Sequence, residues 1–180
     1  MEFFEETLNS RKVYSGKIIN LRVDEVMLPN GKKSTREIVE HQGATAIVAI
    51  NERNEVIMVR QYRKPVELTI LEIPAGRIEA GEDVETCAQR ELMEEIGYYA
   101  GKLIPLIDFY STPGFSNEKM YIFLATQLKS KKKPADSDEN IRIEEIPFEE
   151  AVEKVYSGEI VDAKTIIGLL IANQYLKGVK

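Results

Sequence analysis

Three glutamates in one short segment, Glu91, Glu94 and Glu95, have a spacing that can support chemistry. The segment from Asp83 to Ile96 contains no glycine or proline and consists mostly of good helix formers. It therefore predicts a helix of about four turns, with Gly97 as the residue that stops it. On such a helix Glu91 and Glu95 fall within the apolar stripe, where a surface helix normally carries no charge.

Two carboxylates one helical turn apart on an inward face repel each other and lose hydration. They must either become protonated or find cations. Clustered carboxylate oxygens are hard ligands that suit Mg²⁺ or Mn²⁺ better than zinc, and Arg90 can orient one of them through a bidentate pair. The pattern predicts a divalent metal site on this helix. The apolar stripe around the carboxylates consists of Val84, Cys87, Ala88 and Leu92.

This segment resembles the Nudix box, G-x5-E-x7-R-E-U-x-E-E-x-G-U, in which U is an aliphatic residue. Nine positions at fixed spacing make the motif very specific, and the one departure is Tyr98 at the last aliphatic position. The matching residues are Gly76, Glu82, Arg90, Glu91, Leu92, Glu94, Glu95 and Gly97.

The resemblance implies hydrolysis of a nucleoside diphosphate linked to another group, with Mg²⁺ or Mn²⁺ as cofactor. It implies Glu91 and Glu95 as metal ligands, Glu94 as the next candidate, and a further ligand in the carbonyl of Ala75. It also implies that Gly76 permits a tight backbone turn and that Glu82 either supports the loop through hydrogen bonds or binds a further metal ion at lower occupancy.

Two catalytic assignments stay open at this point. Arg90 orients Glu91 or Glu94, or it contacts a phosphate directly. Some relatives use a glutamate from a late loop as general base, which here implies Glu139; the alternative is that this acidic loop is only solvated.

A second set of motifs resembles the ADP-ribose pyrophosphatase subfamily. Pro113 lies sixteen residues after Gly97, where that subfamily carries a proline. Three further segments resemble the same subfamily: Ser111–Glu118, Val59–Arg63 and Leu71–Gly76. By this resemblance the reaction is ADP-ribose plus water giving AMP and ribose 5-phosphate.

The same resemblance suggests substrate contacts. Arg63 is assigned to a phosphate or to adenine, since arginine can pair or stack, with a surface salt bridge as the alternative. Glu118 is assigned to ribose hydroxyls or to loop stabilisation, and Glu72 to a similar contact. Pro113 shapes the loop. The N-terminal candidates for adenosine contacts are Lys17, Ile18, Ile19 and Glu37.

The elements that position these residues form two parts. Residues 1–42 read as an antiparallel β extension: Ile19, Leu21 and Val23 alternate with polar residues, and Asn30-Gly31 predicts a type I′ turn. Such an extension has too little core to stand alone. In the subfamily it packs across a two-fold dimer, so we expect a homodimer.

Residues 43–180 read as the Nudix hydrolase domain, of α/β (α+β) class. The resemblance implies an α/β/α sandwich in which helices enclose a mixed sheet. Residues 44–50 form a continuous apolar run that predicts a strand buried on both faces. Further predicted strands are 55–60, 68–73, 103–110, 120–126 and 141–145. Two further helices are predicted. Pro147 serves as the first residue of the helix over 148–157, and Asp162 caps the helix over 162–176.

Composition limits the function classes. A chain of 180 residues with 43% hydrophobic residues can build one real core. The net charge of −6 argues against nucleic acid as the main partner. One cysteine, Cys87, leaves no internal disulfide, the start lacks a signal-peptide pattern, and no apolar run approaches about 20 residues. We therefore expect a cytoplasmic enzyme with a small-molecule substrate.

Two alternatives remain beside ADP-ribose hydrolysis. One is a broader nucleoside-diphosphate-sugar pyrophosphatase, acting for example on GDP-mannose. The other is a Nudix module that binds ADP-ribose without cleaving it. Such a sensor has no need to keep Glu91, Glu94 and Glu95 together, and this chain has all three.

Overall fold

The protein is described here from a computed structural model that covers residues 2–131 and 140–178. It divides into two compact units. The main unit comprises Ala44–Asp108 and Met120–Lys180, and the N-terminal unit comprises Met1–Gly43 and Phe109–Lys119. The segment 109–119, which carries Pro113 and Glu118, thus groups with the N-terminal residues.

The main unit is built on a seven-stranded mixed sheet with the path β10-β5-β4-β9-β8, in which β6 pairs with β5 and β7 with β4. Strands β4 and β9 run parallel, with Ala44 opposite Met120, whereas β5 and β7 pair with β4 in antiparallel fashion. The strands are β4 (Ala44–Ile50), β5 (Glu55–Arg63), β6 (Leu68–Glu72), β7 (Ala75–Arg77), β8 (Tyr98–Tyr110), β9 (Lys119–Ser130) and β10 (Arg142–Pro147).

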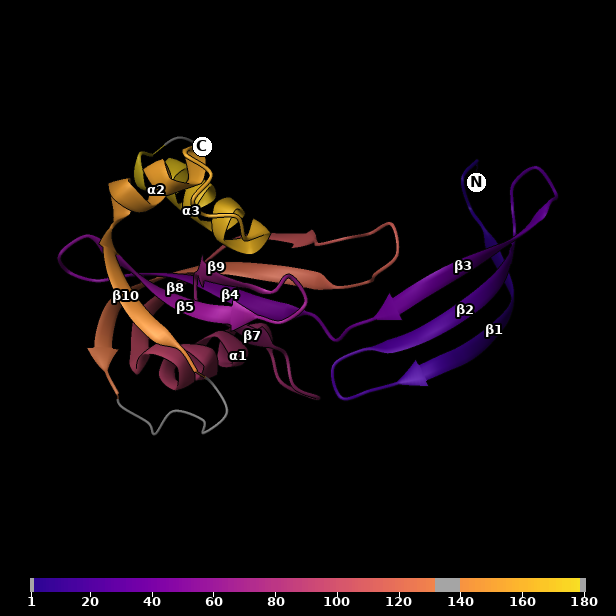
Figure 1. Cartoon of the computed structure of the whole chain (residues 1–180), viewed down its shortest axis with the longest axis horizontal. Helices are drawn as coiled ribbons and strands as arrows, with labels where there is room; N and C mark the ends of the chain where they lie inside the picture. Colours follow the sequence, from indigo (N-terminus) through magenta and orange to yellow (C-terminus); the bar gives the residue numbers. More distant parts are fainter. Residues whose placement is uncertain (1, 132–139, 179–180) are drawn as a thin grey trace. The chain divides into compact units, whose positions relative to one another are not determined.

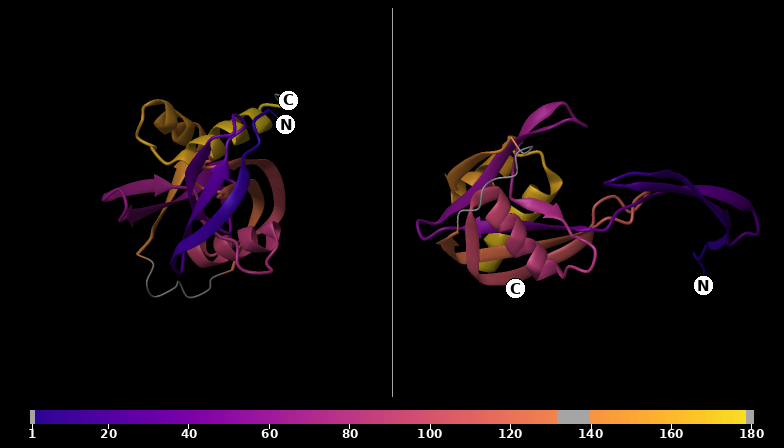
Figure 2. Two further views of the ribbon diagram at one scale, coloured as in Figure 1. Left: turned by 90° about the vertical axis from the view of Figure 1, so that its right-hand side faces the viewer. Right: turned by 90° about the horizontal axis from the view of Figure 1, so that it is seen from below.

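Helices cover both faces of this sheet. The helix α1 (Val84–Glu91) lies on one face, and α2 (Phe148–Tyr156) and α3 (Ala163–Leu176) lie on the other (Figures 1 and 2). This arrangement confirms the predicted α/β class and mixed sheet. Strand β4 is buried at all seven positions because both of its faces are covered, as its continuous apolar run predicts.

The packing on the two faces alternates along β4. Ile47 and Ala49 join Ala88 and Leu92 in one buried cluster on the α1 side. Val48 points to the opposite face, where the backbone of Gly168 in α3 comes so close that a Cβ there would lie 3.1 Å from the Val48 side chain. The sheet and helices therefore meet tightly at the strand that leads to the Nudix box.

The box helix differs from the prediction in its last turn. After Glu91 it continues as a π-helix from Leu92 to Ile96, not as a fourth α-helical turn. Gly97 ends it as predicted, with φ 74° and with its N–H donating to the carbonyl of Leu92. Short π-helical segments are often found at functional sites.

Several boundaries also differ. Strand β8 begins at Tyr98, five residues before its predicted start, and the Gln89 side-chain amide donates to and accepts from the backbone of Ala100 there. Pro147 is the N-cap of α2 and not its first helical residue. Asp162 caps α3 as predicted, since its side chain accepts from the N–H of Thr165.

The N-terminal unit contains a three-stranded antiparallel sheet in the order β1-β2-β3. Its strands are β1 (Glu6–Ser15), β2 (Asn20–Met27) and β3 (Lys33–Glu40). The predicted type I′ turn is wrong, because Gly31 has positive φ but Asn30 does not. Instead the N–H of Gly31 donates to the carbonyl of Leu28 within a longer connection.

The segment 109–119 is attached to β3 by backbone hydrogen bonds. The N–H of Val39 donates to the carbonyl of Phe115 at 2.8 Å, and the N–H of Asn117 donates to Val39 at 3.3 Å. In the described parts of the chain, no helix has the length and apolar character needed to cross a membrane.

Candidate active site

The carboxylate of Glu91 lies directly over Gly76. A Cβ placed on Gly76 would be 1.9 Å from the carboxyl carbon of Glu91, far inside any real contact. Gly76 lies within strand β7, where it pairs with Thr45, and is not one of the glycines with positive φ, so the expectation that it permits a tight turn is wrong. Glycine is needed at this position because the Glu91 carboxylate occupies the space that any other side chain would take.

The carboxylate of Glu95 is held by the same strand. Its Oε2 accepts a hydrogen bond from the backbone N–H of Ala75 at 2.9 Å. Glu91 and Glu95 are only 8% and 9% exposed, which confirms that both face inward. Strand β7, which pairs with β4, thus carries Ala75 and Gly76 against the box helix.

Arg90 connects the carboxylates. Its Nε and Nη2 each donate to Glu82 at 2.9 Å, and its Nη1 donates to Glu91 at 2.6 Å and to Glu94 at 3.1 Å. The hydrogen bonds from Arg90 lower the pKa of Glu82 to about 2, against the opposing effect of its burial. Glu82 also accepts from the N–H of Glu79, so it ties Arg90 to the loop before the helix.

Cys87 lies beside this network as a buried thiol. Its burial raises its pKa to about 11, although the hydroxyl of Thr45 donates a hydrogen bond to it at 3.3 Å. The thiol therefore stays protonated at neutral pH and is a poor nucleophile. Its burial agrees with its predicted place in the apolar stripe of the helix.

The donor chemistry of this face fits a hard divalent ion, because the predicted ligands offer only carboxylate and carbonyl oxygens. In residues 2–131 and 140–178, however, no three acidic, histidine or cysteine side chains stand together as a group that could hold a metal. Glu91 and Glu94 share Arg90 instead. The predicted ligands Ala75, Glu91, Glu94 and Glu95 stay predictions.

A second charge cluster surrounds the buried Glu72 and involves Arg63 and Lys164. Arg63 forms a bidentate pair with Glu72, with distances of 2.6 and 2.7 Å. Lys164 also donates to Glu72 and lies 3.0 Å from Asp162. Burial acts to raise the pKa of Glu72, but the hydrogen bond from Arg63 and the charge of Lys164 outweigh it and leave the pKa lowered.

Glu72 itself is fully buried, with 0% of its surface exposed. Its geometry favours holding Arg63 over contacting a ribose directly. Lys164 was missed by the sequence reasoning, although it carries a signal. A lysine in the first turn of a helix is disfavoured by the helix dipole and so suggests a specific acidic partner.

The other predicted substrate residues belong to the N-terminal unit. Glu118 accepts a hydrogen bond from Ser111 at 2.5 Å and lies 3.5 Å from His41, and Pro113 lies in the turn where Thr112 accepts from Phe115. Lys17, Ile18 and Ile19 line a pocket of about 460 Å³ with Tyr14 and Gly16, and Glu37 pairs with Val23 in the sheet. Glu139 lies outside the described residues.

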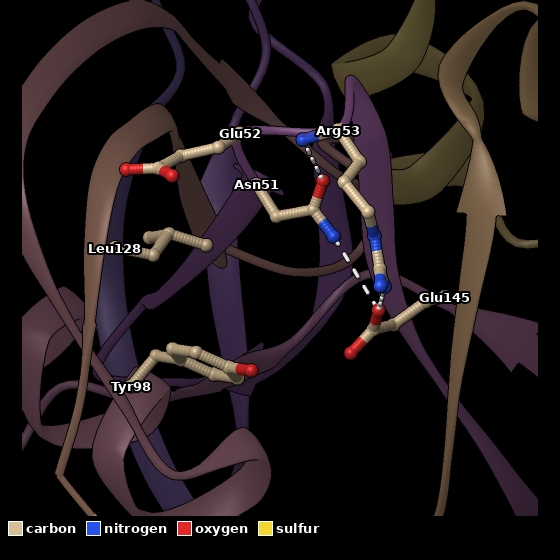
Figure 3. Close-up of a pocket in the computed structure, with 6 residues that line it drawn as sticks. All are labelled: Asn51, Glu52, Arg53, Tyr98, Leu128 and Glu145. Carbon is tan, nitrogen blue, oxygen red and sulfur yellow. Dashed lines mark hydrogen bonds and ion pairs between the residues drawn. The ribbon is translucent and has the colours of Figure 1, made fainter.

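A pocket of about 390 Å³ lies elsewhere on the main unit (Figure 3). Tyr98 and Leu128 line one side, and on the other Arg53 and Asn51 bond to Glu145 (Figure 3). None of the box glutamates lines it. These contacts hold the β4–β5 turn against β10, so the packing of these elements accounts for the pocket.

Comparison with known proteins agrees with this geometry. The family described as NUDIX domain matches residues 40–166. The chain belongs to the Nudix family. A second family, described as Nucleoside diphosphate sugar hydrolase N-terminal domain, matches residues 5–39. Nudix hydrolases generally need divalent metal ions and act on small molecules such as nucleotide sugars.

Individual relatives cover nearly the whole chain. An ADP-ribose pyrophosphatase of Bacillus subtilis is 46% identical over 96% of this chain and 92% of its own length. A methanol dehydrogenase activator of Bacillus methanolicus is 43% identical over 97% and 94%. Among solved structures, an ADP compounds hydrolase has a TM-score of 0.86 at 25% identity and covers 97% of this chain and 95% of that one.

Proposed function

We propose that this protein hydrolyses the diphosphate of ADP-ribose to AMP and ribose 5-phosphate, with Mg²⁺ or Mn²⁺ as cofactor. The observation that carries the proposal is the pair of buried carboxylates, Glu91 and Glu95, held against Ala75 and Gly76. Burying two carboxylates is costly unless cations compensate their charge, and bound divalent ions would do so. The 46% identity to an ADP-ribose pyrophosphatase supports the substrate.

In this proposal Glu91, Glu94, Glu95 and the carbonyl of Ala75 hold the ions. When bound, divalent ions neutralise diphosphate charge and lower the pKa of the attacking water. Arg90 holds Glu91 and Glu94 in place through the bonds described above. We assign Glu139 as the general base and Arg63 to a phosphate of the substrate, where a guanidinium pairs well.

Substrate recognition completes the proposal. We assign Glu118 to ribose hydroxyls, with Pro113 shaping its loop, and Lys17, Ile18, Ile19 and Glu37 to adenosine. We further propose a homodimer in the cytoplasm. Support for the dimer comes from the N-terminal unit, in which many large apolar residues are exposed. They are Phe3, Phe4, Leu8, Val13, Tyr14, Ile18 and Ile19.

The test is product analysis by chromatography after incubation with ADP-ribose or GDP-mannose, each with Mg²⁺ or with EDTA. We expect AMP from ADP-ribose only with metal. Glu95→Gln should abolish the product, whereas Glu85→Gln, on the same helix but exposed, should not. Faster turnover of GDP-mannose would move the assignment to the broader class. Tight ADP-ribose binding without cleavage under any divalent ion would show a sensor.

A further inference from the structure

The fully buried Glu72 bridges two cations from distant parts of the main unit. Arg63 comes from the end of β5 and Lys164 from the first turn of α3. Arg63 uses both Nε and Nη2 for Glu72, at 2.6 and 2.7 Å. Two nitrogens on one carboxylate fix the plane of the guanidinium as well as its position. The orientation of Arg63 is therefore set by Glu72.

This orientation leaves part of Arg63 available. Its Nη1 has no hydrogen-bond partner among the described residues, and its side chain is 40% exposed. Glu72, which holds Arg63, lies three residues before Ala75, and the N–H of Ala75 donates to the carboxylate of Glu95. Arg63 is thus held by the same short segment that contacts a box carboxylate.

Hydrogen bonds fix the first turn of α3, which carries Lys164. Asp162 caps the helix and accepts from the N–H and the hydroxyl of Thr165, at 3.0 and 2.5 Å. The hydroxyl oxygen of Thr165 in turn accepts from the N–H of Ile73 at 3.0 Å. Both Glu72 and the backbone next to it are therefore held by one turn of α3, close in sequence to Ala75.

A purely structural ion pair is the simpler explanation for these contacts, but it explains them poorly. A buried carboxylate with two cations gives little net stability, because desolvation offsets the attraction. A lysine in a first helical turn also opposes the helix dipole. The contacts are better explained if they hold the partly exposed guanidinium of Arg63 in a fixed position beside the acidic site.

We propose that Glu72 and Lys164 are positioning residues that hold Arg63 for the diphosphate of the substrate. The inference rests on the proposed function and deepens it, since it assigns Glu72 to Arg63 and not to a ribose hydroxyl. The positive charge of Lys164 balances the negative charge of Glu72, and Glu72 in turn keeps Arg63 in one orientation. Removal of Lys164 should loosen Arg63 without touching the box carboxylates.

The test is a mutant cycle with steady-state kinetics on ADP-ribose. Lys164→Met should raise KM about tenfold, a loss of about 1.4 kcal/mol in binding, and leave kcat within about twofold. Lys154→Met is the matched control, because Lys154 is also a partly buried helix lysine with two glutamate partners. It should leave KM unchanged.

The double variant with Arg63→Ala decides whether Lys164 acts through Arg63. If it does, Arg63→Ala with Lys164→Met should have the KM of Arg63→Ala alone, because the two effects share one contact to the substrate. Additive effects, or a fall in kcat at constant KM, would overturn the proposal. If Lys164→Met fails to fold, Glu72→Gln enters the same cycle with the same expectations. A wild-type protein that does not cleave ADP-ribose would instead refute the proposed function.

Discussion

Strands β4 and β1 stand at opposite extremes of burial. All seven residues of β4 are buried, and all ten residues of β1 are exposed. The main unit packs side chains on both faces of its sheet and so has a core of its own. In the sheet of β1 to β3 only Asp24 and Val26 are buried.

This difference bears on the two tasks that we propose for the protein, catalysis and assembly. A rigid, self-sufficient core can hold charged groups in costly positions, as it does with Glu91 and Glu95. A sheet with only two buried residues has little stability of its own and is suited to contacts with something outside the unit. The comparison predicts that changes in the main unit damage chemistry and changes in β1 damage assembly.

The largest effect should come from Gly76→Ala. The added methyl would collide with the Glu91 carboxylate, and displacing a catalytic group by about 1 Å costs about 100-fold in rate. We expect kcat/KM for ADP-ribose to fall by at least about that factor, measured by AMP formation. The circular dichroism spectrum should stay native. Full activity in Gly76→Ala would show that Glu91 need not lie where the structure has it.

Leu8→Asp should come next, with its effect on assembly. Leu8 lies on β1 and is 41% exposed, and Leu176 in α3 is a matched control at 48%. An unpaired charge in a dimer interface costs about 3 kcal/mol, which would weaken the dimer by about 100-fold. Sedimentation should show monomers for Leu8→Asp and dimers for Leu176→Asp. The reverse result would place the dimer contact on the main unit.

Glu82→Gln should have a moderate, pH-dependent effect on stability. Because Arg90 lowers the pKa of Glu82 to about 2 from an ordinary 4.5, the ionised carboxylate stabilises the fold above pH 4.5 and this contribution is lost as pH falls toward 2. We expect Glu82→Gln to lose about 1–2 kcal/mol at pH 7, an estimate reduced for solvent screening. In urea titrations the gap to wild type should shrink below pH 4.5. A constant gap would show that the charge of Glu82 is not what matters.

The smallest effect should be that of Lys33→Met in the N-terminal sheet. Its pair with Glu25 is exposed, with the lysine side chain 64% accessible, and such pairs contribute less than about 1 kcal/mol. We expect a change below about 0.5 kcal/mol in the free energy of unfolding. A larger loss would mean that the N-terminal sheet depends on its ion pairs as the main unit does on Arg90.

The sequence predicts the main unit well where burial leaves a pattern. The apolar run of β4 and the inward glutamates of the box both follow from side-chain periodicity. Strand β1 was not predicted, because a strand exposed on both faces has no alternation to detect. Its residues 6–15 mix polar and apolar types without a period of two.

What could not be predicted depends on contacts between distant segments. The π-helical turn from Leu92 to Ile96 uses residues that favour an ordinary α-helix. The reason for Gly76 lies in a side chain fifteen positions later, and Glu72 meets Lys164 across 92 positions. The candidate residues of the box are thus visible in the sequence, but the residues that hold them are visible only in the fold.

The hydrogen bond from Ile73 to Thr165 also bears on the order in which the protein matures. It joins positions 92 apart, and contacts of such separation form late because the loop between them must close first. During synthesis the box helix is complete long before the first turn of α3 emerges. Until then the segment before Ala75 lacks its bond to α3 and is held to the main unit by the pairing of β7 with β4, so we expect full activity only after the last helix docks.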